Sequence, residues 1–301
     1  MRAALVWSDE LLSYDFGYGH PMRSSRCKMG VEELSKIKEL EIFPPRYAEE
    51  EELLFVHTED YMRSVKEGKA GDLDTPVPPS MYDPARLSAG ATLRAVELTL
   101  NEGYDIAVNL CGGWHHAFEN RARGFCIFND VALAARYAQK LGAKRVFILD
   151  WDEHHGDGTQ KIFYNDDTVF TMSIHQHPST QYPYVSGYES ENTKTNFNIP
   201  IMPGEREQDI LKRVLPQIPL KVRPFKPDFF IVQMGVDGHK DDPMSSIDLG
   251  DRFYEEIAKI FARCVKNHNS KVILLGGGGF NFPKTAELWR KIVETFIKNM
   301  K

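Results

Sequence analysis

Short apolar runs alternate with amphipathic stretches along most of the chain. The apolar runs predict buried strands, and they lie at 2–7, 105–110, 146–149, 168–174, 228–234 and 271–275. Between them, apolar positions at helical spacing predict helices at 30–40, 84–100, 129–139, 208–220 and 253–267. This alternation is typical of an α/β protein whose parallel sheet is flanked by helices. The length allows two domains, but α/β folds of this size often form one, and we expect a single domain spanning residues 1–301.

The stretch 145–158 (RVFILDWDEHHGDG) departs most from this pattern, because a buried strand gives way to carboxylates and imidazoles. Side chains two positions apart in an extended segment share a face, so Asp150, Asp152 and His154 point the same way. An Asp-x-His pair offers one oxygen and one nitrogen to a metal, and a catalytic zinc usually takes three protein ligands. The alternative interpretation is a solvated acidic loop with incidental histidines.

A third ligand is expected after another strand. Asp237 follows the apolar run at 228–234 and lies between two glycines. Its position suits a ligand, because bound groups in open α/β sheets gather at the carboxyl ends of the strands. His239, Asp241 and Asp242 lie in the same loop and are rivals by composition.

Histidines follow two other strands. His115 and His116 come after the strand at 105–110 and a glycine pair. Tandem histidines at a strand end favour a general base. His175 and His177 follow the strand at 168–174 without a nearby acid, and we interpret them as packing residues of a loop.

Two further segments are unusual in composition. The loop at 68–84 is long, which indicates either the mouth of a substrate site or a variable surface connection. The glycine run at 276–279 follows the last strand and indicates close approach of the backbone to another group. No Lys-Ser/Thr pair follows these glycines, so a phosphate-binding P-loop is disfavoured.

Charge and cysteine content narrow the classes of function. The net charge of −6 gives no basic field for a nucleic acid, and no apolar run approaches the ~20 residues of a membrane span. We therefore expect no direct binding to nucleic acid and no membrane insertion. The scattered cysteines indicate reduced thiols in a cytoplasmic compartment; they are Cys27, Cys111, Cys126 and Cys264.

Five segments together resemble the motif set of the histone deacetylase family. They are GGWHHA at 112–117, GFCIFND at 124–130, DWDEHHGDG at 150–158, GVDGHKDDPM at 235–244 and LGGGGF at 275–280. The family's superfamily also contains acetoin-utilisation proteins and acetylpolyamine amidohydrolases. The resemblance extends over nearly the whole chain and implies the arginase/deacetylase fold, a single domain with a catalytic zinc, or iron in its place.

The resemblance also implies roles for individual residues. His116 would be the general base with His115 as its partner, and two carboxylates would orient these imidazoles. The residues implied as metal ligands are Asp152, His154 and Asp237; those that orient the histidines are Asp150 and Asp157; and those that contact the substrate in an acyl-lysine tunnel are Phe125, Tyr182, Gly124 and Gly278.

Two further sites are implied by the same resemblance. A structural monovalent cation, expected to be potassium, would lie beside the metal, and Arg26 would line an internal channel behind it. The cation would be held by backbone oxygens of Asp150, Asp152, His154 and Ile174 and by side-chain oxygens of Asp152 and Ser173.

Phe280 departs from the family pattern, which has a tyrosine after the glycines. That tyrosine's hydroxyl binds the oxyanion of the reaction, and losing one such donor typically costs ~10²–10³ in kcat. Three explanations compete: an engineered tyrosine-to-phenylalanine knockout, a natural variant acting on another acyl group or a more reactive amide, and an acyl-lysine-binding protein without turnover.

The implied partner is an acylated lysine peptide or a small acylated amine. A hydrolase for acetylpolyamine-like amides would need acidic groups at the tunnel mouth, and the 68–84 loop offers Asp72, Asp74 and Asp83. The oligomeric state is left open.

Overall fold

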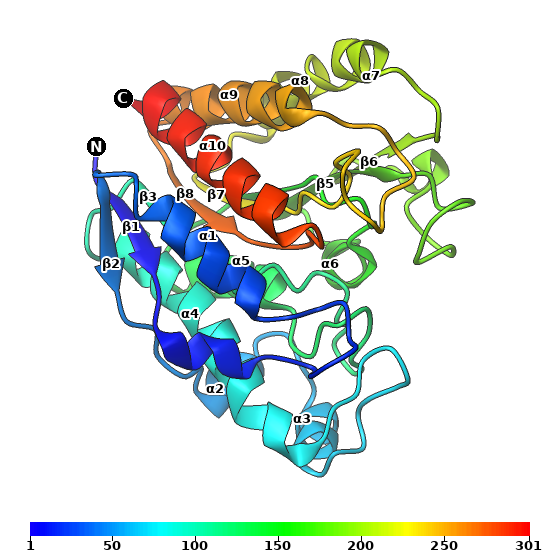
Figure 1. Cartoon of the computed structure of the whole chain (residues 1–301). Helices are drawn as coiled ribbons and strands as arrows, with labels where there is room; N and C mark the ends of the chain where they lie inside the picture. Colours follow the sequence, from blue (N-terminus) through cyan, green and yellow to red (C-terminus); the bar gives the residue numbers. More distant parts are fainter.

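One central sheet organises the chain, as Figure 1 shows for a computed structural model that describes residues 1–301. The strand order is β2-β1-β3-β8-β7-β4-β5-β6, and each neighbouring pair is parallel. The strands are β1 (Ala3–Val6), β2 (Leu40–Phe43), β3 (Ile106–Asn109), β4 (Val146–Asp150), β5 (Val169–Gln176), β6 (Asn196–Ile201), β7 (Phe229–Gln233) and β8 (Lys271–Leu275).

Helices cover both faces of this sheet, so the predicted fold class is confirmed. On one face α1, α9 and α10 pack together, and on the other α4 and α5 pack against each other and against the central strands. The α-helices are α1 (Ser25–Leu34), α2 (Glu50–Leu53), α3 (Glu59–Lys66), α4 (Tyr82–Leu100), α5 (Asp130–Lys140), α6 (Asp157–Phe163), α7 (Glu207–Val214), α8 (Gln217–Phe225), α9 (Asp251–Asn267) and α10 (Phe282–Met300).

The strands read as continuous apolar runs because both of their faces are buried. In β4, Ile148 belongs to the core beneath α4 and α5, whereas its neighbours Phe147 and Leu149 belong to the core beneath α9 and α10. All five residues of β4 are buried. The two cores therefore divide between them the alternating side chains of β4.

The parallel arrangement places the carboxyl ends of all strands along one edge of the sheet. The loops that follow β3, β4, β7 and β8 meet there, and β8, β7 and β4 are consecutive in the sheet order. This juxtaposition brings together segments that are far apart in the sequence and provides the frame for the site described below.

The first predicted helix was placed wrongly. It was expected at 30–40, but α1 covers Ser25–Leu34. Gly30 lies in its middle, where a Cβ atom would come within 2.7 Å of Leu110 and of Trp289 on α10. The glycine is therefore a point of close approach between α1 and its neighbours, and not a helix start.

The predicted helix at 208–220 is interrupted. It is divided into α7 and α8 around Pro216, whose ring removes a backbone donor and so disfavours a continuous helix. The predicted set also lacked the long helix α10 and the edge strand β2, in which Ile42 is exposed. Strand β5 extends to Gln176, so His175 lies in a strand and the interpretation of it as a loop residue was wrong.

No helix is both long enough and apolar enough to cross a bilayer. The four cysteines are all free and buried. One of them, Cys27, contacts the carbonyl oxygen of Leu110 at 3.5 Å, so it packs against the end of β3.

Candidate active site

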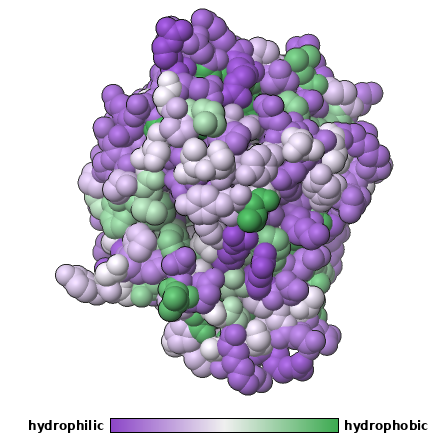
Figure 2. Space-filling view, turned by 90° about the vertical axis from the view of Figure 1, so that its right-hand side faces the viewer, coloured by the Kyte–Doolittle hydropathy of each residue, from purple (hydrophilic) through white to green (hydrophobic).

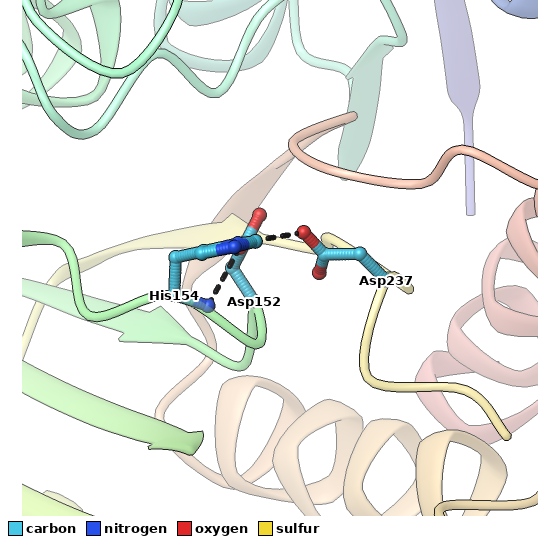
Figure 3. Close-up of side chains that lie close together, drawn as sticks. All are labelled: Asp152, His154 and Asp237. Carbon is cyan, nitrogen blue, oxygen red and sulfur yellow. Dashed lines mark hydrogen bonds and ion pairs between the residues drawn. The ribbon is translucent and has the colours of Figure 1, made fainter. Parts of the chain in front are cut away.

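The three predicted metal ligands lie together at the carboxyl edge of the sheet (Figure 3). Asp152 and His154 follow β4, and Asp237 follows β7. His154 Nδ1 lies 3.1 Å from Asp152 Oδ1 and 3.0 Å from Asp237 Oδ2, and the three ligand atoms lie within 4.8 Å of one another. The side chains of all three residues are buried or nearly so.

This donor set fits a divalent cation. Two carboxylates and one imidazole are ordinary zinc ligands, and three protein ligands leave a position free for substrate or water. Burial, reinforced by the neighbouring Asp152 carboxylate, raises the pKa of Asp237 to about 7. Two buried carboxylates at this spacing therefore favour a positive partner.

The three rivals of Asp237 have other contacts. His239 Nε2 lies 3.0 Å from Asp251 Oδ1, and the side chain of Asp241 is about half exposed at the surface. Asp242 Oδ2 accepts the backbone N–H of Phe280 at 2.6 Å. Asp242 therefore holds the segment after the glycine run and does not join the ligand set.

The glycine run holds Asp152 from the side of β8. Gly278 N–H donates to Asp152 Oδ2 at 2.7 Å, and Gln233 Nε2 donates to the same oxygen at 2.7 Å. A Cβ atom at Gly278 would fall 2.0 Å from Asp237 Oδ2, so only glycine fits there. The predicted close approach of this backbone is thus an approach to the ligands themselves.

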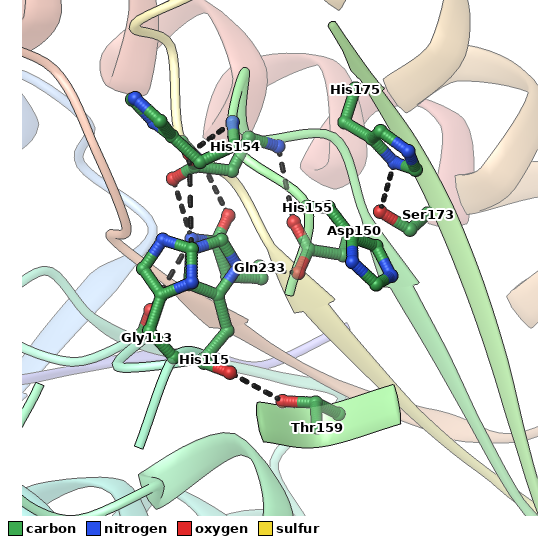
Figure 4. A network of polar contacts seen from close by, with 12 residues as sticks. Gly113, His115, Asp150, His154, His155, Thr159, Ser173, His175 and Gln233 are labelled. Carbon is green, nitrogen blue, oxygen red and sulfur yellow. Dashed lines mark hydrogen bonds and ion pairs between the residues drawn. The ribbon is translucent and has the colours of Figure 1, made fainter. Parts of the chain in front are cut away.

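Each of the tandem histidines is paired with a carboxylate. His115 Nδ1 lies 2.7 Å from Asp150 Oδ2, and His116 Nδ1 lies 2.8 Å from Asp157 Oδ1. Figure 4 shows the His115 carbonyl oxygen facing the side chain of Thr159, whose hydroxyl donates to it at 3.4 Å. The backbone N–H of Thr159 donates to the same oxygen at 3.1 Å. The structure therefore brings together the two histidines and the two carboxylates that were expected to orient them.

The two imidazoles differ in charge. Burial lowers the pKa of His115, but the Asp150 and Asp152 carboxylates outweigh it and raise this pKa to about 9. Burial and the adjacent His115 lower the pKa of His116 to about 4, against the effect of Asp157. At neutral pH, His115 is charged and His116 is neutral. A neutral His116 that donates from Nδ1 to Asp157 keeps a basic lone pair on Nε2.

The histidines and metal ligands line a cavity of about 490 Å³ that opens at this edge. Its aromatic walls are Phe125, Tyr182 and Phe280, and the predicted Gly124 and Gly278 also line it. The Phe125 and Phe280 rings meet edge to face, with centroids 6.4 Å apart. Figure 2 views the molecule from this side and shows the most hydrophobic residues as small separate spots.

The mouth of the cavity includes part of the 68–84 loop. Leu73 and Asp74 line it, together with His20, Tyr184 and Met244 from other loops. Leu73 is almost fully exposed. The loop therefore lines a cavity and is more than a surface connection.

Four of the five residues expected around a monovalent cation are divided between two cavities, and the fifth, Ile174, is buried and lines neither. Asp150 and Ser173 line a small polar cavity, whereas Asp152 and His154 line the large one. Ser173 Oγ lies 2.7 Å from Nδ1 of His175.

Arg26 is fully buried behind the glycine run. Its Nη1 donates to the carbonyl oxygen of Gly277 at 2.5 Å, and the guanidinium lies between the rings of Trp114 and Trp289, at 5.7 and 5.6 Å from their centroids. Its Nη2 has no hydrogen-bond partner. A buried cation with a free donor is suited to meet an anion.

Sequence reasoning missed several residues that shape the site. Asp130 accepts the backbone N–H groups of Gly113 and Trp114 and so fixes the loop that carries the histidines. Gln233 and Arg123 were also missed. Gln233 had a signal, since it is a polar residue in an otherwise apolar strand; Arg123 had none, because its partners lie elsewhere in the sequence.

Comparison with known proteins identifies the family. A model of the histone deacetylase domain matches residues 20–296. The chain is 33% identical to the acetoin utilization protein AcuC of Bacillus subtilis, over 98% of this chain and 80% of that protein. It is 34% identical to a probable deacetylase of Archaeoglobus fulgidus, over 93% of this chain and 82% of that protein.

Solved structures agree with this assignment. A histone deacetylase homologue from Aquifex aeolicus superposes with a TM-score of 0.86 at 30% identity, covering 100% of this chain and 84% of that chain. The HD domain of HDA15 shares the fold, with a TM-score of 0.85 at 24% identity, covering 98% of this chain and 90% of that chain. The chain therefore belongs to the histone deacetylase family, whose members hydrolyse acyl amides.

Proposed function

We propose that the protein is a zinc-dependent amidohydrolase that removes acetyl or other acyl groups from acyl-lysine side chains or related acylated amines. The observation that carries this proposal is the convergence, in one cavity, of three buried metal-ligand side chains and two histidine–aspartate pairs. The whole chain, 1–301, would act as one catalytic domain.

Asp152, His154 and Asp237 would hold the metal. A zinc ion bound there supplies Lewis-acid chemistry: it polarises the acyl carbonyl and lowers the pKa of a water molecule. Iron would use the same ligands. The carboxylates of Asp152 and Asp237 would balance the charge of a dication.

His116 would accept a proton from the attacking water through Nε2, because its Nδ1 is engaged by Asp157. Its low pKa keeps it neutral and available at neutral pH. His115, held by Asp150, would carry positive charge beside it and stabilise negative charge on the substrate oxygen. The histidine pair would then return a proton to the leaving amine.

The walls of the cavity suit a linear acylated side chain. Phe125 and Tyr182 would pack against its methylene groups, and Gly124 and Gly278 leave room for it. Asp74 is the one carboxylate among the residues that line the mouth. A single mouth carboxylate favours an acyl-lysine peptide over a polycationic small amine.

Two accessory sites form part of the same proposal. Potassium would bind beside the metal at Asp150, Asp152, His154, Ser173 and Ile174, supported by the polar cavity next to Asp150 and Ser173. Arg26 would line an internal channel, supported by its buried and unpartnered Nη2.

Phe280 favours a second candidate, an acyl-lysine-binding protein with little turnover. The ring lines the cavity but has no hydroxyl to donate to an oxyanion. The three explanations given above, engineered knockout, altered acyl specificity and binding protein, predict different responses when that hydroxyl is supplied.

The test is turnover of fluorogenic acyl-lysine peptides of increasing acyl length by the zinc-loaded protein and by Phe280→Tyr. A rise of ~10²–10³-fold on acetyl-lysine in Phe280→Tyr supports a deacetylase that lacks its oxyanion donor. Activity of the parent on another acyl group supports altered specificity. If both proteins bind the peptides tightly and hydrolyse none, the hydrolase proposal fails and the binding protein is favoured.

A further inference from the structure

Arg123 lies directly behind the wall of the cavity. It precedes Gly124 and Phe125, and it forms a two-way backbone bridge with Cys126: Arg123 N–H donates at 3.0 Å and its carbonyl accepts at 2.9 Å. Both Gly124 and Phe125 have positive φ, 55° and 68°. This tight turn fixes the backbone from which the Arg123 side chain extends.

The guanidinium contacts two residues that belong to different parts of the site. Its Nε donates to Tyr182 Oη at 2.5 Å, and its Nη1 lies 2.9 Å from Asp157 Oδ2. The cation also lies over the Tyr182 ring, 4.9 Å from its centroid. One guanidinium therefore connects a wall of the cavity, through a hydrogen bond, with the carboxylate that orients His116, through an ion pair.

These contacts close a ring of four residues. Asp157 Oδ1 holds His116 Nδ1 at 2.8 Å, and the His116 ring meets the Tyr182 ring edge to face, with centroids 5.0 Å apart. Arg123 joins Asp157 and Tyr182 on the opposite side. Each member of the ring is thus held by two others.

The polar contact of Asp157 Oδ2 is its ion pair with Arg123. This oxygen is buried and has no hydrogen-bond partner, and the Asp157 side chain is only 2% exposed. A buried charge without a partner is costly, so the carboxylate would turn toward other donors if the guanidinium were removed. That rotation would release His116 Nδ1.

We propose that Arg123 is a positioning residue, which holds the Asp157 carboxylate and the Tyr182 ring so that His116 keeps one orientation and one tautomer. The proposal rests on the function proposed above, in which His116 is the base. Its chemical content is that Arg123 contributes to turnover through Asp157, while its contact with Tyr182 holds the guanidinium in place.

The experiment compares Arg123→Met, Arg123→Lys and Tyr182→Phe. Arg121→Met is the matched control, because Arg121 lies in the same loop, is exposed, and packs over Phe118 with its guanidinium 4.2 Å from the ring centroid. The measurements on zinc-loaded protein are kcat and KM, metal content, affinity for a hydroxamate inhibitor, and ¹⁵N-histidine NMR of the His116 Nδ1–H signal, assigned with His116→Gln.

We expect Arg123→Met to lower kcat by ~10–100-fold, the usual cost of losing a partner that orients a site residue. KM, metal content and hydroxamate affinity should stay within about threefold, and the slowly exchanging Nδ1–H signal should be lost. Arg123→Lys should recover part of kcat, because it restores the charge but not the fork. Tyr182→Phe keeps the ion pair, so kcat should fall by only about two- to fivefold.

The proposal is overturned if Arg123→Met matches Arg121→Met in kcat and keeps the Nδ1–H signal. It is also overturned if Arg123→Met and Arg123→Lys lose metal and hydroxamate binding together with kcat, since the arginine would then support the fold alone. If the parent protein turns over no acyl substrate, the proposed function fails, but the NMR comparison still decides whether Arg123 fixes His116.

Discussion

The two histidine–aspartate pairs of the site have almost the same bond length, 2.7 Å for His115–Asp150 and 2.8 Å for His116–Asp157. They differ in what surrounds each pair. His115 Nε2 also lies 3.9 Å from the Asp152 carboxylate, whereas Asp157 shares its second oxygen with Arg123. Two carboxylates therefore lie near His115, whereas His116 has one carboxylate whose charge is balanced by the Arg123 guanidinium.

This difference shows that a histidine–aspartate pair does not define a role by itself. The extra carboxylate helps to raise the pKa of His115 to about 9, and burial beside a charged neighbour lowers that of His116 to about 4. Neighbouring residues of one loop can therefore serve as a fixed positive charge and as a neutral base. Groups whose surroundings separate their pKa values in this way are suited to divide acid and base work.

The strongest test of the comparison removes each imidazole in turn. We expect His116→Ala to lower kcat by ~10²–10⁴-fold, the usual contribution of a general base, and His115→Ala to lower it less. Steady-state kinetics of zinc-loaded protein measures both losses, with metal content as the control. Equal losses would contradict the division of roles.

Replacing each carboxylate by its amide separates orientation from charge. We expect Asp157→Asn to lower kcat by ~10–100-fold at all pH values, because the amide holds His116 less well. Asp150→Asn should instead lower the pKa of His115, because the nearest negative charge is lost. Profiles of kcat against pH would show a lower plateau for Asp157→Asn and a displaced alkaline limb for Asp150→Asn. The same profile for both variants would contradict the different roles of the two pairs.

The pH profile of kcat/KM should be bell-shaped. His116 acts in its neutral form, which is lost as pH falls through about 4, and His115 acts in its charged form, which is lost as pH rises through about 9. Outside these limits the rate should change ~tenfold per pH unit. Measurement between pH 3 and 10 checks both limbs, and an acid limb near pH 6.5 would mean that His116 is not held as described.

A change in the shared loop should affect both pairs alike. Asp130 holds the loop ahead of both histidines through Gly113 and Trp114. We expect Asp130→Asn to lower the free energy of unfolding by about 1–3 kcal/mol, since a buried donor loses its acceptor, and to change kcat only a few-fold. Chemical denaturation measures the change in the free energy of unfolding. A displacement of only one limb of the pH profile would contradict the expectation that both pairs are affected alike.

Much of the site could be predicted because its chemistry is concentrated at strand ends. Apolar runs located the strands, and polar residues directly after them marked the carboxyl edge. The residue pattern alone left Asp237 among three rivals, and the family resemblance favoured it before the structure placed it 3.0 Å from His154.

The parts that escaped prediction depend on contacts across the sequence. Arg123 and Tyr182 lie 59 positions apart, and Gln233 and Asp152 lie 81 apart. No local pattern indicates such partners. Gly30 was misread for the same reason, since its small size matters only where α10 packs against α1.

The neighbouring placement of β4, β7 and β8 has a consequence for how the chain folds during its synthesis. The ligand set and its backbone donor follow three strands that are adjacent in the sheet, yet β8 (Lys271–Leu275) comes after both β4 and β7 in the sequence. During synthesis, a ribosome-bound chain can present Asp152, His154 and Asp237 before it can present Gly278. The complete site therefore forms only after β8 has left the ribosome and inserted between β7 and β3.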